Sequence, residues 1–188
     1  MYNTEKKGTR CLICTGCGRC PGVIRGMQVV TEKLALPHLQ LKNEQGIRLM
    51  TVDIGTTTIA MQLYDMCGKV VDSFPSVNPQ VSYGADVLSR IKAAQDPEKA
   101  ADMQQKVQNL IAKGVQRFSK KLDDGEQLRM VIAANTTMVY LLMGWDPEEL
   151  GRAPFQVSHT VPETTQIAGV PCHIIPGLSA FVGGDITA

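Results

Sequence analysis

The sequence lacks the features that mark membrane, secreted and nucleic-acid-binding proteins. None of its apolar runs approaches the roughly 18 to 20 residues that a membrane span requires. The first seven residues, Met-Tyr-Asn-Thr-Glu-Lys-Lys, have no apolar segment behind them, so no signal peptide is expected. The formal net charge is only +1, which offers no basic surface for nucleic acid. We therefore expect a cytoplasmic protein that has neither a membrane nor a nucleic acid as partner.

What the sequence does contain is enough apolar material for a folded core. Residues of apolar type make up 44% of the 188 residues, which argues against a disordered chain. That length is typical of one domain or slightly more. The sequence therefore predicts a globular protein with a core of its own.

The six cysteines are not spread like a disulfide framework. Cys11, Cys14, Cys17 and Cys20 form a Cys-x-x-Cys-x-x-Cys-x-x-Cys run that Pro21 follows, a clustering that indicates a metal site in a reducing compartment. The run resembles the bacterial ferredoxin signature but is one residue short before its last cysteine. A zinc ribbon separates its two cysteine pairs by roughly 12 to 20 residues. The spacing favours one [4Fe–4S] cluster, with zinc as the alternative.

The two remaining cysteines, Cys67 and Cys172, stand alone in the sequence. Unclustered cysteines most often behave as small hydrophobic residues of the core. We therefore expect both to be buried and assign them no chemistry.

The stretch Met50–Ala60 is the one around which the rest of the chain is organised. An apolar run leads into Asp53, Gly55 and two threonines follow, and a second β-type run leaves, so a tight hairpin is predicted. Backbone N–H groups in such a turn can form an anion-binding concavity, to which threonine hydroxyls add donors. A neighbouring carboxylate is suited to Mg²⁺. The turn is either a nucleotide phosphate site with Asp53 as its metal-associated carboxylate, or an ordinary hairpin turn.

Strands and helices are expected to alternate over the rest of the chain. The clearest helix has Asp96 as its cap, Pro97 at its first position and an apolar face that runs to Leu122. A buried strand is expected to lead into Asn135, the cap of a further helix. The other expected elements are strands at 69–74, 128–134 and 173–176, helices at 84–91, 135–142 and 146–150, and a turn into a helix at 177–188. This order predicts an α/β fold.

Several separated blocks of the sequence together resemble one known family. Asp53–Thr57 looks like the first phosphate loop of the ATPase superfamily that includes actin, sugar kinases and heat-shock chaperones; no Walker A loop is present. Within that superfamily, the chain is similar to the ATP-dependent reductive activators of corrinoid proteins, which are iron–sulfur ATPases. The resemblance covers about residues 47 to 188 and rests on blocks that occur in the family's order: Asp53–Thr57, Asn78–Gln80, Gly84–Ile91, Asn135–Met138, Leu141–Gly144, Asp146–Pro147, Leu150–Gly151, Ala153–Phe155 and Ala180–Ile186.

The resemblance implies a fold and a division of the chain. The fold would be a ribonuclease-H-like (actin-like ATPase) half-domain, a mixed sheet with opening β-hairpins flanked by helices. Residues 1–22 would form the cysteine-rich cluster segment, 23–46 a linker, and 47–188 the first part of the ATPase domain. No second Asp-x-Gly-Thr loop occurs in the sequence. We therefore expect either an N-terminal fragment of a longer protein or a natural half-domain that needs a partner, and in both cases a chain that hydrolyses ATP poorly by itself.

The resemblance also implies a function. Corrinoid proteins cycle through Co(I), which is occasionally oxidised to inactive Co(II), and family members return it by passing a low-potential electron from an iron–sulfur cluster with the help of ATP and Mg²⁺. The implied partners are a corrinoid protein or corrinoid methyltransferase, an upstream electron donor and a second copy of the chain in a homodimer.

The roles implied for single residues follow the family's blocks. Asp53 would hold Mg²⁺, and Gly55, Thr56 and Thr57 would contact phosphate. Cys11, Cys14, Cys17 and Cys20 would hold the cluster. The other matching positions, which would line the cleft, are Gln80, Asp86, Asn135, Gly183, Gly184 and Asp185. A helix-entry turn for Gln80 and Asp86, a cap for Asn135 and a simple turn for Asp185 are the alternatives.

Two positions depart from the family pattern, and two other functions compete with this one. Ala134 stands where family members tend to have Gly, and Tyr140 where they tend to have His.

A small-molecule kinase of the same superfamily would have no use for the cysteine run, because phosphoryl transfer needs no low-potential cluster. A non-catalytic iron–sulfur or zinc module that binds a partner is the other alternative.

Overall fold

A computed structural model describes residues 46–159, 165–175, 177, 179–180 and 183–187. The predicted cluster segment 1–22 and the linker 23–46 lie outside these residues, apart from Gly46. The structure therefore leaves the cluster ligands Cys11, Cys14, Cys17 and Cys20 as predictions.

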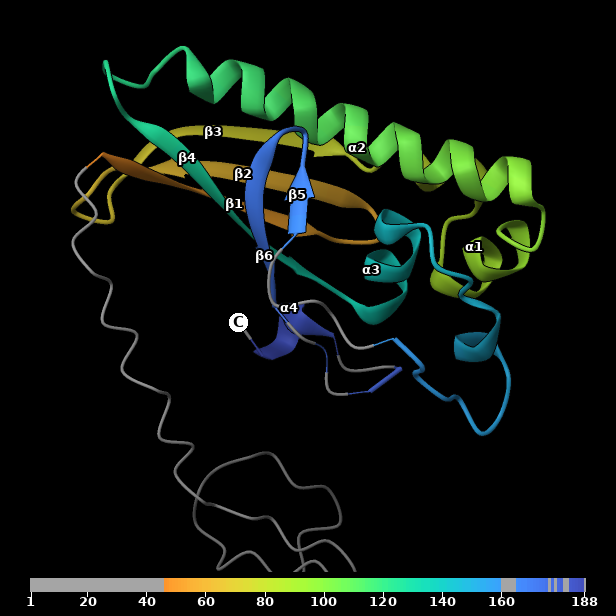
Figure 1. The fold of residues 1–188 in the computed structure, drawn as a ribbon. Helices are drawn as coiled ribbons and strands as arrows, with labels where there is room; N and C mark the ends of the chain where they lie inside the picture. The colour runs from red at the N-terminus through yellow and green to blue at the C-terminus, as the bar shows by residue number, and fades with distance from the viewer. Residues whose placement is uncertain (1–45, 160–164, 176, 178, 181–182, 188) are drawn as a thin grey trace, which may run out of the picture. The chain divides into compact units, whose positions relative to one another are not determined.

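A six-stranded mixed sheet forms the centre of the described fold (Figure 1). Its strand order is β3-β2-β1-β4-β6-β5, in which β1, β4 and β6 are mutually parallel neighbours and the remaining pairs are antiparallel. Because parallel strands end at the same edge, the residues that follow β1, β4 and β6 gather there. The strands are β1 Ile47–Ile54, β2 Thr58–Tyr64, β3 Val70–Val77, β4 Gln127–Ala134, β5 Thr165–Ile167 and β6 Val170–Ile174.

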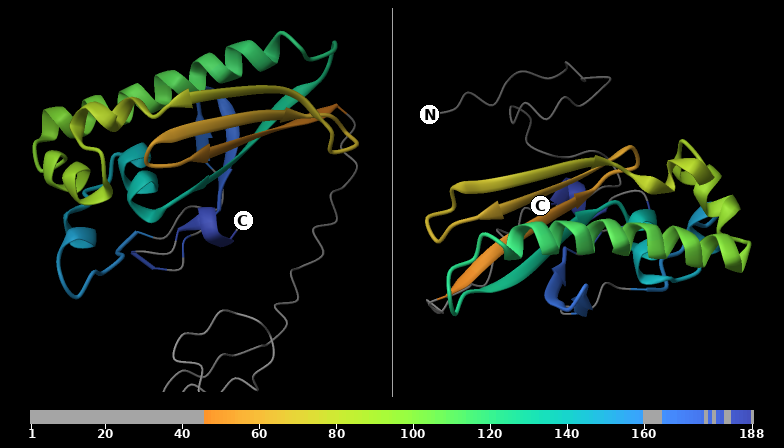
Figure 2. Two further views of the ribbon diagram at one scale, coloured as in Figure 1. Left: turned by 180° about the vertical axis from the view of Figure 1, so that it is seen from behind. Right: turned by 90° about the horizontal axis from the view of Figure 1, so that it is seen from above.

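The helices connect and cover these strands. The long helix α2 lies across one face of the sheet, and α4 lies away from it, at the ends of β4 and β6 (Figures 1 and 2). The helical elements are the 3₁₀ turn η1 Pro79–Tyr83, α1 Val87–Ala93, α2 Pro97–Ser119, α3 Thr136–Met143, the 3₁₀ turn η2 Glu148–Gly151 and α4 Gly184–Thr187.

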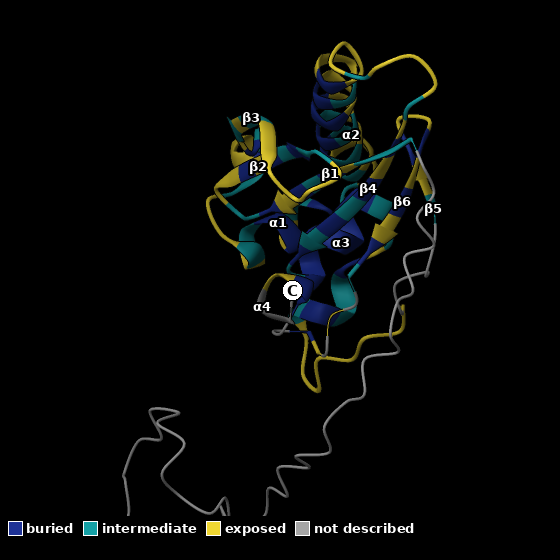
Figure 3. Cartoon of the chain, turned by 90° about the vertical axis from the view of Figure 1, so that its left-hand side faces the viewer, coloured by how far each residue is buried: buried dark blue, intermediate teal, exposed yellow. Residues whose placement is uncertain are grey.

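The main core lies between the sheet and α2, where buried residues gather (Figure 3). Alternate residues of β1 and β2, such as Met50 and Met61, are fully buried toward the helix. Gly114 of α2 lies so close to the sheet that a Cβ there would come within 2.4 Å of the Met61 sulfur. This glycine therefore sets how closely the helix packs on the strands, and the packed core fixes the edge at which the site is built.

Most of the predicted elements are confirmed. The hairpin of β1 and β2 forms as expected, and Asp96 caps α2 by accepting from the backbone N–H groups of Glu98 and Lys99. The helix expected at 84–91 begins only at Val87, because Asp86 caps it. The antiparallel strand β5 was not expected from the sequence.

The prediction for the isolated cysteines was right for one of them. Cys172 is buried, and that burial raises the pKa of its thiol to about 12. Cys67 is exposed, which corrects the expectation that it is buried. It sits in the turn between β2 and β3, next to the exposed residues Met66 and Gly68.

None of the helices in the described part of the chain is both long enough and apolar enough to cross a membrane.

Candidate functional site

The turn between β1 and β2 stands at the edge where the parallel strands end. Its hairpin closes through one backbone bond, in which the Gly55 N–H donates to the Thr58 carbonyl at 2.9 Å. A Cβ on Gly55 would lie 3.0 Å from that same carbonyl oxygen, so a glycine suits the tight closure. Asp53, one residue before the end of β1, has an exposed side chain beside the turn.

Three successive carbonyls of this turn are held from within the protein. The Nδ2 of Asn78 donates to the Gly55 carbonyl at 2.8 Å, and its backbone N–H donates to the Thr57 carbonyl at 2.9 Å. Between them, Nη2 of Arg90 donates to the Thr56 carbonyl at 2.5 Å. Both Asn78 and Arg90 are completely buried.

This anchoring turns the backbone donors of the loop in the opposite direction. In a trans peptide unit the carbonyl of one residue and the N–H of the next point opposite ways, and the cis bond of the described chain lies elsewhere, at Ala153–Pro154. The N–H groups of Thr56 and Thr57 therefore face away from Asn78 and Arg90. Within the residues that the structure describes, neither N–H donates to a protein acceptor. Adjacent outward N–H groups of this kind favour an anion.

A second carboxylate, Asp185, acts on Asp53. The pKa of Asp53 is raised above its ordinary value, first because the surrounding protein displaces water from the carboxylate and second because the charge of Asp185 repels it. Asp185 is exposed and stands in the first turn of α4. A carboxylate whose charge is disfavoured by burial and by a second carboxylate is a donor that suits a hard divalent cation such as Mg²⁺.

Gly183 and Gly184 bring Asp185 to this edge by close backbone packing. A Cβ on Gly183 would come within 2.2 Å of the Asn135 Cα, and one on Gly184 within 2.4 Å of the Ile175 carbonyl oxygen. Both contacts involve backbone atoms, which cannot move aside as a flexible side chain could. The two glycines therefore permit α4 to dock at the ends of β4 and β6.

The other residues predicted to line the cleft have structural partners. Gln80 is buried and donates to the Met103 carbonyl at 3.2 Å, so its amide is bonded to α2 in the protein interior. Asp86 caps α1 and accepts from both the N–H and the hydroxyl of Ser89. Asn135 caps α3, and its Nδ2 also lies 3.4 Å from the Thr56 hydroxyl oxygen. Of these three, Asn135 touches the turn directly.

Asn78 and Arg90 were not predicted from the sequence to be functional residues. Asn78 was part of a predicted turn, and Arg90 was part of a predicted helix. One signal was available for Arg90: it falls on the same helical face as Val87, Ile91 and Ala94, where an apolar side chain is expected. A charged residue in that position indicates a buried polar contact.

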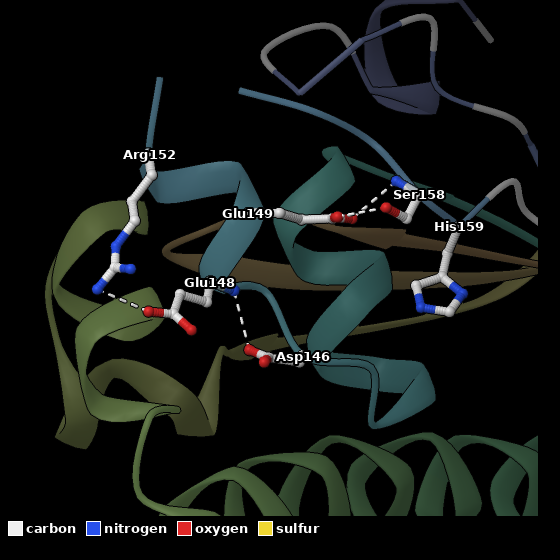
Figure 4. Close-up of a pocket in the computed structure, with 6 residues that line it drawn as sticks. All are labelled: Asp146, Glu148, Glu149, Arg152, Ser158 and His159. Atoms are coloured by element: carbon white, nitrogen blue, oxygen red, sulfur yellow. Dashed lines mark hydrogen bonds and ion pairs between the residues drawn. The ribbon is translucent and has the colours of Figure 1, made fainter. Parts of the chain in front are cut away.

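A separate pocket of about 400 Å³ opens beside η2 (Figure 4). Its carboxylates already have partners. Glu149 accepts from the N–H and hydroxyl of Ser158, and Glu148 pairs with Arg152 at 2.7 Å. The hydroxyl of Tyr140 donates to Glu149 at 2.7 Å. No group of three or more potential ligands among the described residues could hold a metal. We assign this pocket no ligand; its lining residues are Asp146, Glu148, Glu149, Arg152, Ser158 and His159.

Comparison with known proteins connects this geometry to a family. The model of the RACo middle region matches residues 49–188. The chain is 30% identical over 159 residues to a corrinoid activation enzyme, RamQ, from Eubacterium limosum, covering 78% of this chain and 27% of that protein. It also resembles the solved structure of a reductive activator for a corrinoid, iron–sulfur protein, with 29% identity and a TM-score of 0.68, covering 77% of this chain and 25% of the other.

The chain thus spans about a quarter of the length of these two relatives. The match to the family model includes the turn at Gly55–Thr57, both carboxylates and all the elements of the sheet from β2 onward. The resemblance found in the sequence is confirmed: this chain belongs to the family of the RACo middle region, that of the reductive activators of corrinoid proteins.

Proposed function

We propose that this chain supplies the phosphate-binding part of an ATP-dependent reductive activator of a corrinoid protein. The mixed sheet with its opening hairpins supports a half-domain of ribonuclease-H-like, actin-like ATPase type. One observation carries the proposal. The turn at Gly55–Thr57 presents anchored, outward N–H groups close to Asp53, whose ionised form is disfavoured by burial and by the charge of Asp185.

The residues present fit MgATP. Asp53 and Asp185 would hold Mg²⁺, directly or through water, and the cation would relieve the repulsion between them. The N–H groups of Thr56 and Thr57, with the hydroxyls of the same residues, would bind phosphate oxygens. The side chain of Asn135 would fix the orientation of the Thr56 hydroxyl. Gly183 and Gly184 would keep Asp185 within reach of the same cation.

The redox half of the proposal rests on the cysteine segment. Cys11, Cys14, Cys17 and Cys20 would hold a [4Fe–4S] cluster, which supplies one-electron transfer at low potential. A single electron from an upstream donor would pass through it and reduce Co(II) to Co(I) in the corrinoid partner. For one electron, every ~59 mV of unfavourable gap corresponds to about 1.4 kcal/mol. ATP would drive the transfer by favouring one state of a cleft that closes around its phosphates, in a cytoplasmic complex with that partner.

The phosphate half is tested by titrating MgATP into the protein at the full length that its gene encodes. We expect saturable binding that requires Mg²⁺. Gly55→Val, which crowds the turn against the Thr58 carbonyl, should weaken it by roughly tenfold or more. Gly125→Val is a control for a strained glycine substitution far from the turn, because Gly125 has open space around it but a φ of +86°; it should lower stability without changing the affinity. Equal affinities for the wild type and Gly55→Val would contradict the assignment of the turn.

The redox half is tested by anaerobic reconstitution with iron and sulfide, followed by EPR of the dithionite-reduced protein. We expect about four irons per chain and a reduced-cluster signal, as four thiolates imply. Both should be lost when Cys14 and Cys17 are changed to Ser, and Cys67→Ser should change neither. One zinc per chain without an EPR signal would exclude the electron-transfer role and leave a metal-bound module.

A further inference from the structure

Arg90 is a buried cation without a carboxylate partner in the described chain. Its side chain is completely buried, and burial lowers its pKa. Its guanidinium donates to carbonyl oxygens of Thr56 at 2.5 Å and Gly84 at 3.0 Å and lies 3.4 Å from the Gln80 side-chain oxygen. All three acceptors are neutral, and the sulfur of Met138 at 3.3 Å completes the surroundings.

The nearest carboxylate that acts on Arg90 is engaged elsewhere. Asp86 favours the charged form of Arg90, but its oxygens accept from the N–H and hydroxyl of Ser89. A buried charge that lacks a direct counter-charge destabilises the folded protein, because the lost hydration is not replaced. A hydrophobic residue at this position of α1 would avoid that cost. The presence of an arginine is therefore explained by what its charge and its shape do for the turn.

We propose that Arg90 is a positioning residue of the phosphate site, acting through the peptide unit that joins Thr56 to Thr57. This inference rests on the proposed function, and it identifies Arg90 as a residue that sets the affinity of the turn for phosphate. The planar guanidinium fork spans the Thr56 and Gly84 carbonyls at once, which fixes the turn relative to the start of α1. The Thr57 N–H is thereby held outward.

The charge of Arg90 also strengthens that N–H as a donor. A hydrogen bond accepted by a carbonyl polarises the peptide unit, so its N–H becomes a better donor to an anion on the other side. The bond from Arg90 is charge-assisted and short, and it lies in a protein interior where electrostatic interactions are stronger than in water. A polyphosphate bound to the turn would in return offset the buried positive charge. The ligand class that this arrangement recognises is a polyphosphate that carries several negative charges.

The test uses Arg90→Lys and Arg90→Gln in the protein at the full length that its gene encodes. Lysine keeps the charge but cannot reach two carbonyls with a planar fork, and glutamine loses the charge as well. Arg117→Lys and Arg117→Gln are matched controls on α2, where Arg117 pairs with Asp72 at 2.8 Å on the protein surface. Isothermal titration measures the affinities for MgATP and for magnesium tripolyphosphate, which carries phosphates but no base.

We expect Arg90→Lys to weaken both ligands by about tenfold and Arg90→Gln by up to about a hundredfold, the range for hydrogen bonds that involve a charged group. The Arg117 variants should bind like the wild type. Circular dichroism establishes that each variant is folded at the titration temperature. Among folded variants, an arginine with a merely structural role would leave the affinity for both ligands unchanged. Folded Arg90→Lys with wild-type affinity for both ligands would overturn the proposal.

A second variant covers the case in which the Arg90 substitutions do not fold. Gln80→Met keeps a similar volume but removes one acceptor of the guanidinium, together with the donor to the Met103 carbonyl on α2, and it leaves the residues of the turn themselves unchanged. We expect about threefold weaker tripolyphosphate binding, as for the loss of one modest bond, and unchanged affinity would count against the role of Arg90. Failure of the proposed function gives a different result: a wild type that binds neither ligand. Even then, shifted Thr57 amide resonances in ligand-free Arg90→Lys would show that Arg90 positions the turn, and unshifted ones would refute it.

Discussion

Two hairpin turns of the same sheet satisfy their backbone hydrogen-bonding groups in opposite ways. The turn between β2 and β3 satisfies itself: the Asp65 carboxylate accepts from the backbone N–H groups of Cys67 and Lys69, each at 2.9 Å. The turn between β1 and β2 receives its bonds from residues far along the chain, Asn78 and Arg90, and these hold carbonyls rather than N–H groups.

The difference explains why one turn is a candidate site and the other is not. In the β2–β3 turn an internal anion, Asp65, already occupies the backbone donors, and those bonds lower its pKa. In the β1–β2 turn the bonds from within the protein use the acceptors and leave the donors outward. A turn that is stabilised through its carbonyls can bind an anion, whereas a turn that is stabilised through its N–H groups has supplied its own.

The largest expected effect comes from Asp53→Asn, which removes the charge beside the first turn. MgATP binding should weaken by about a hundredfold, since a carboxylate ligand of the cation is lost. The folded protein should also become more stable at pH 7, because the raised pKa means that ionised Asp53 destabilises the native state. Titration calorimetry and thermal unfolding at several pH values measure both.

The pH dependence of this stability difference tests the direction of the pKa shift of Asp53. The stability difference should be present at neutral pH and should vanish once the pH falls below the ordinary range of a carboxyl group, where Asp53 is protonated in both states. An Asp53→Asn protein that is less stable than the wild type at pH 7 would contradict this account of the site.

The next largest effect is a difference in protein stability between variants that weaken one turn and variants that weaken the other. Asn78→Ala leaves the partly buried Gly55 carbonyl without its donor and removes the cap of η1, so we expect a loss of roughly 2–4 kcal/mol in the free energy of unfolding. Asp65→Ala, the matched change in the exposed turn, should lower stability less. Urea unfolding followed by circular dichroism compares the two, and losses of equal size would remove the distinction drawn between the turns.

A third variant gives the first turn the internal anion of the second. Thr57→Asp places a carboxylate on the exposed side of the turn and should weaken tripolyphosphate binding by about tenfold through repulsion. Thr57→Ser keeps the hydroxyl and should bind nearly as the wild type does. A titration in competition with MgATP measures the ratio of the tripolyphosphate affinities of the two variants. Equal affinities for Thr57→Asp and Thr57→Ser would argue that phosphate does not bind at this turn.

The smallest effect should be confined to the second turn. Gly68 has a φ of +77° with open space around it, so Gly68→Ala should cost only about 1 kcal/mol of backbone strain. Because this turn has no part in the proposed site, the affinity for MgATP should not change. Thermal unfolding and one titration are sufficient, and altered affinity would mean that the two turns are coupled.

The sequence predicted the features of this site that depend on local patterns. Alternating apolar residues predicted the hairpin of β1 and β2, and Asp96 with Pro97 predicted the start of α2. The family blocks pointed to Asp53 and to the turn, whose positions the structure describes. These predictions succeeded in structural terms because strand alternation, helix capping and turn chemistry are set by neighbours in the chain.

The supports of the turn could not be predicted in the same way. Asn78 contacts Gly55, and Arg90 contacts Thr56, across distances in sequence that no local pattern specifies. The approach of Asp185 depends on the close packing of two glycines against backbone at the ends of β4 and β6. Only the tertiary fold shows that such contacts share one edge of the sheet.

The docking of α4 also has a consequence for the order in which the protein folds. Asp53 lies near the start of the described chain and Asp185 near its end, so the second carboxylate reaches the first only after the intervening elements are in place. Contacts between residues far apart in sequence form slowly. We therefore expect the sheet and α2 to give their spectroscopic signals early in refolding and affinity for Mg²⁺ to develop afterwards. The metal would then report the last step of assembly rather than the first.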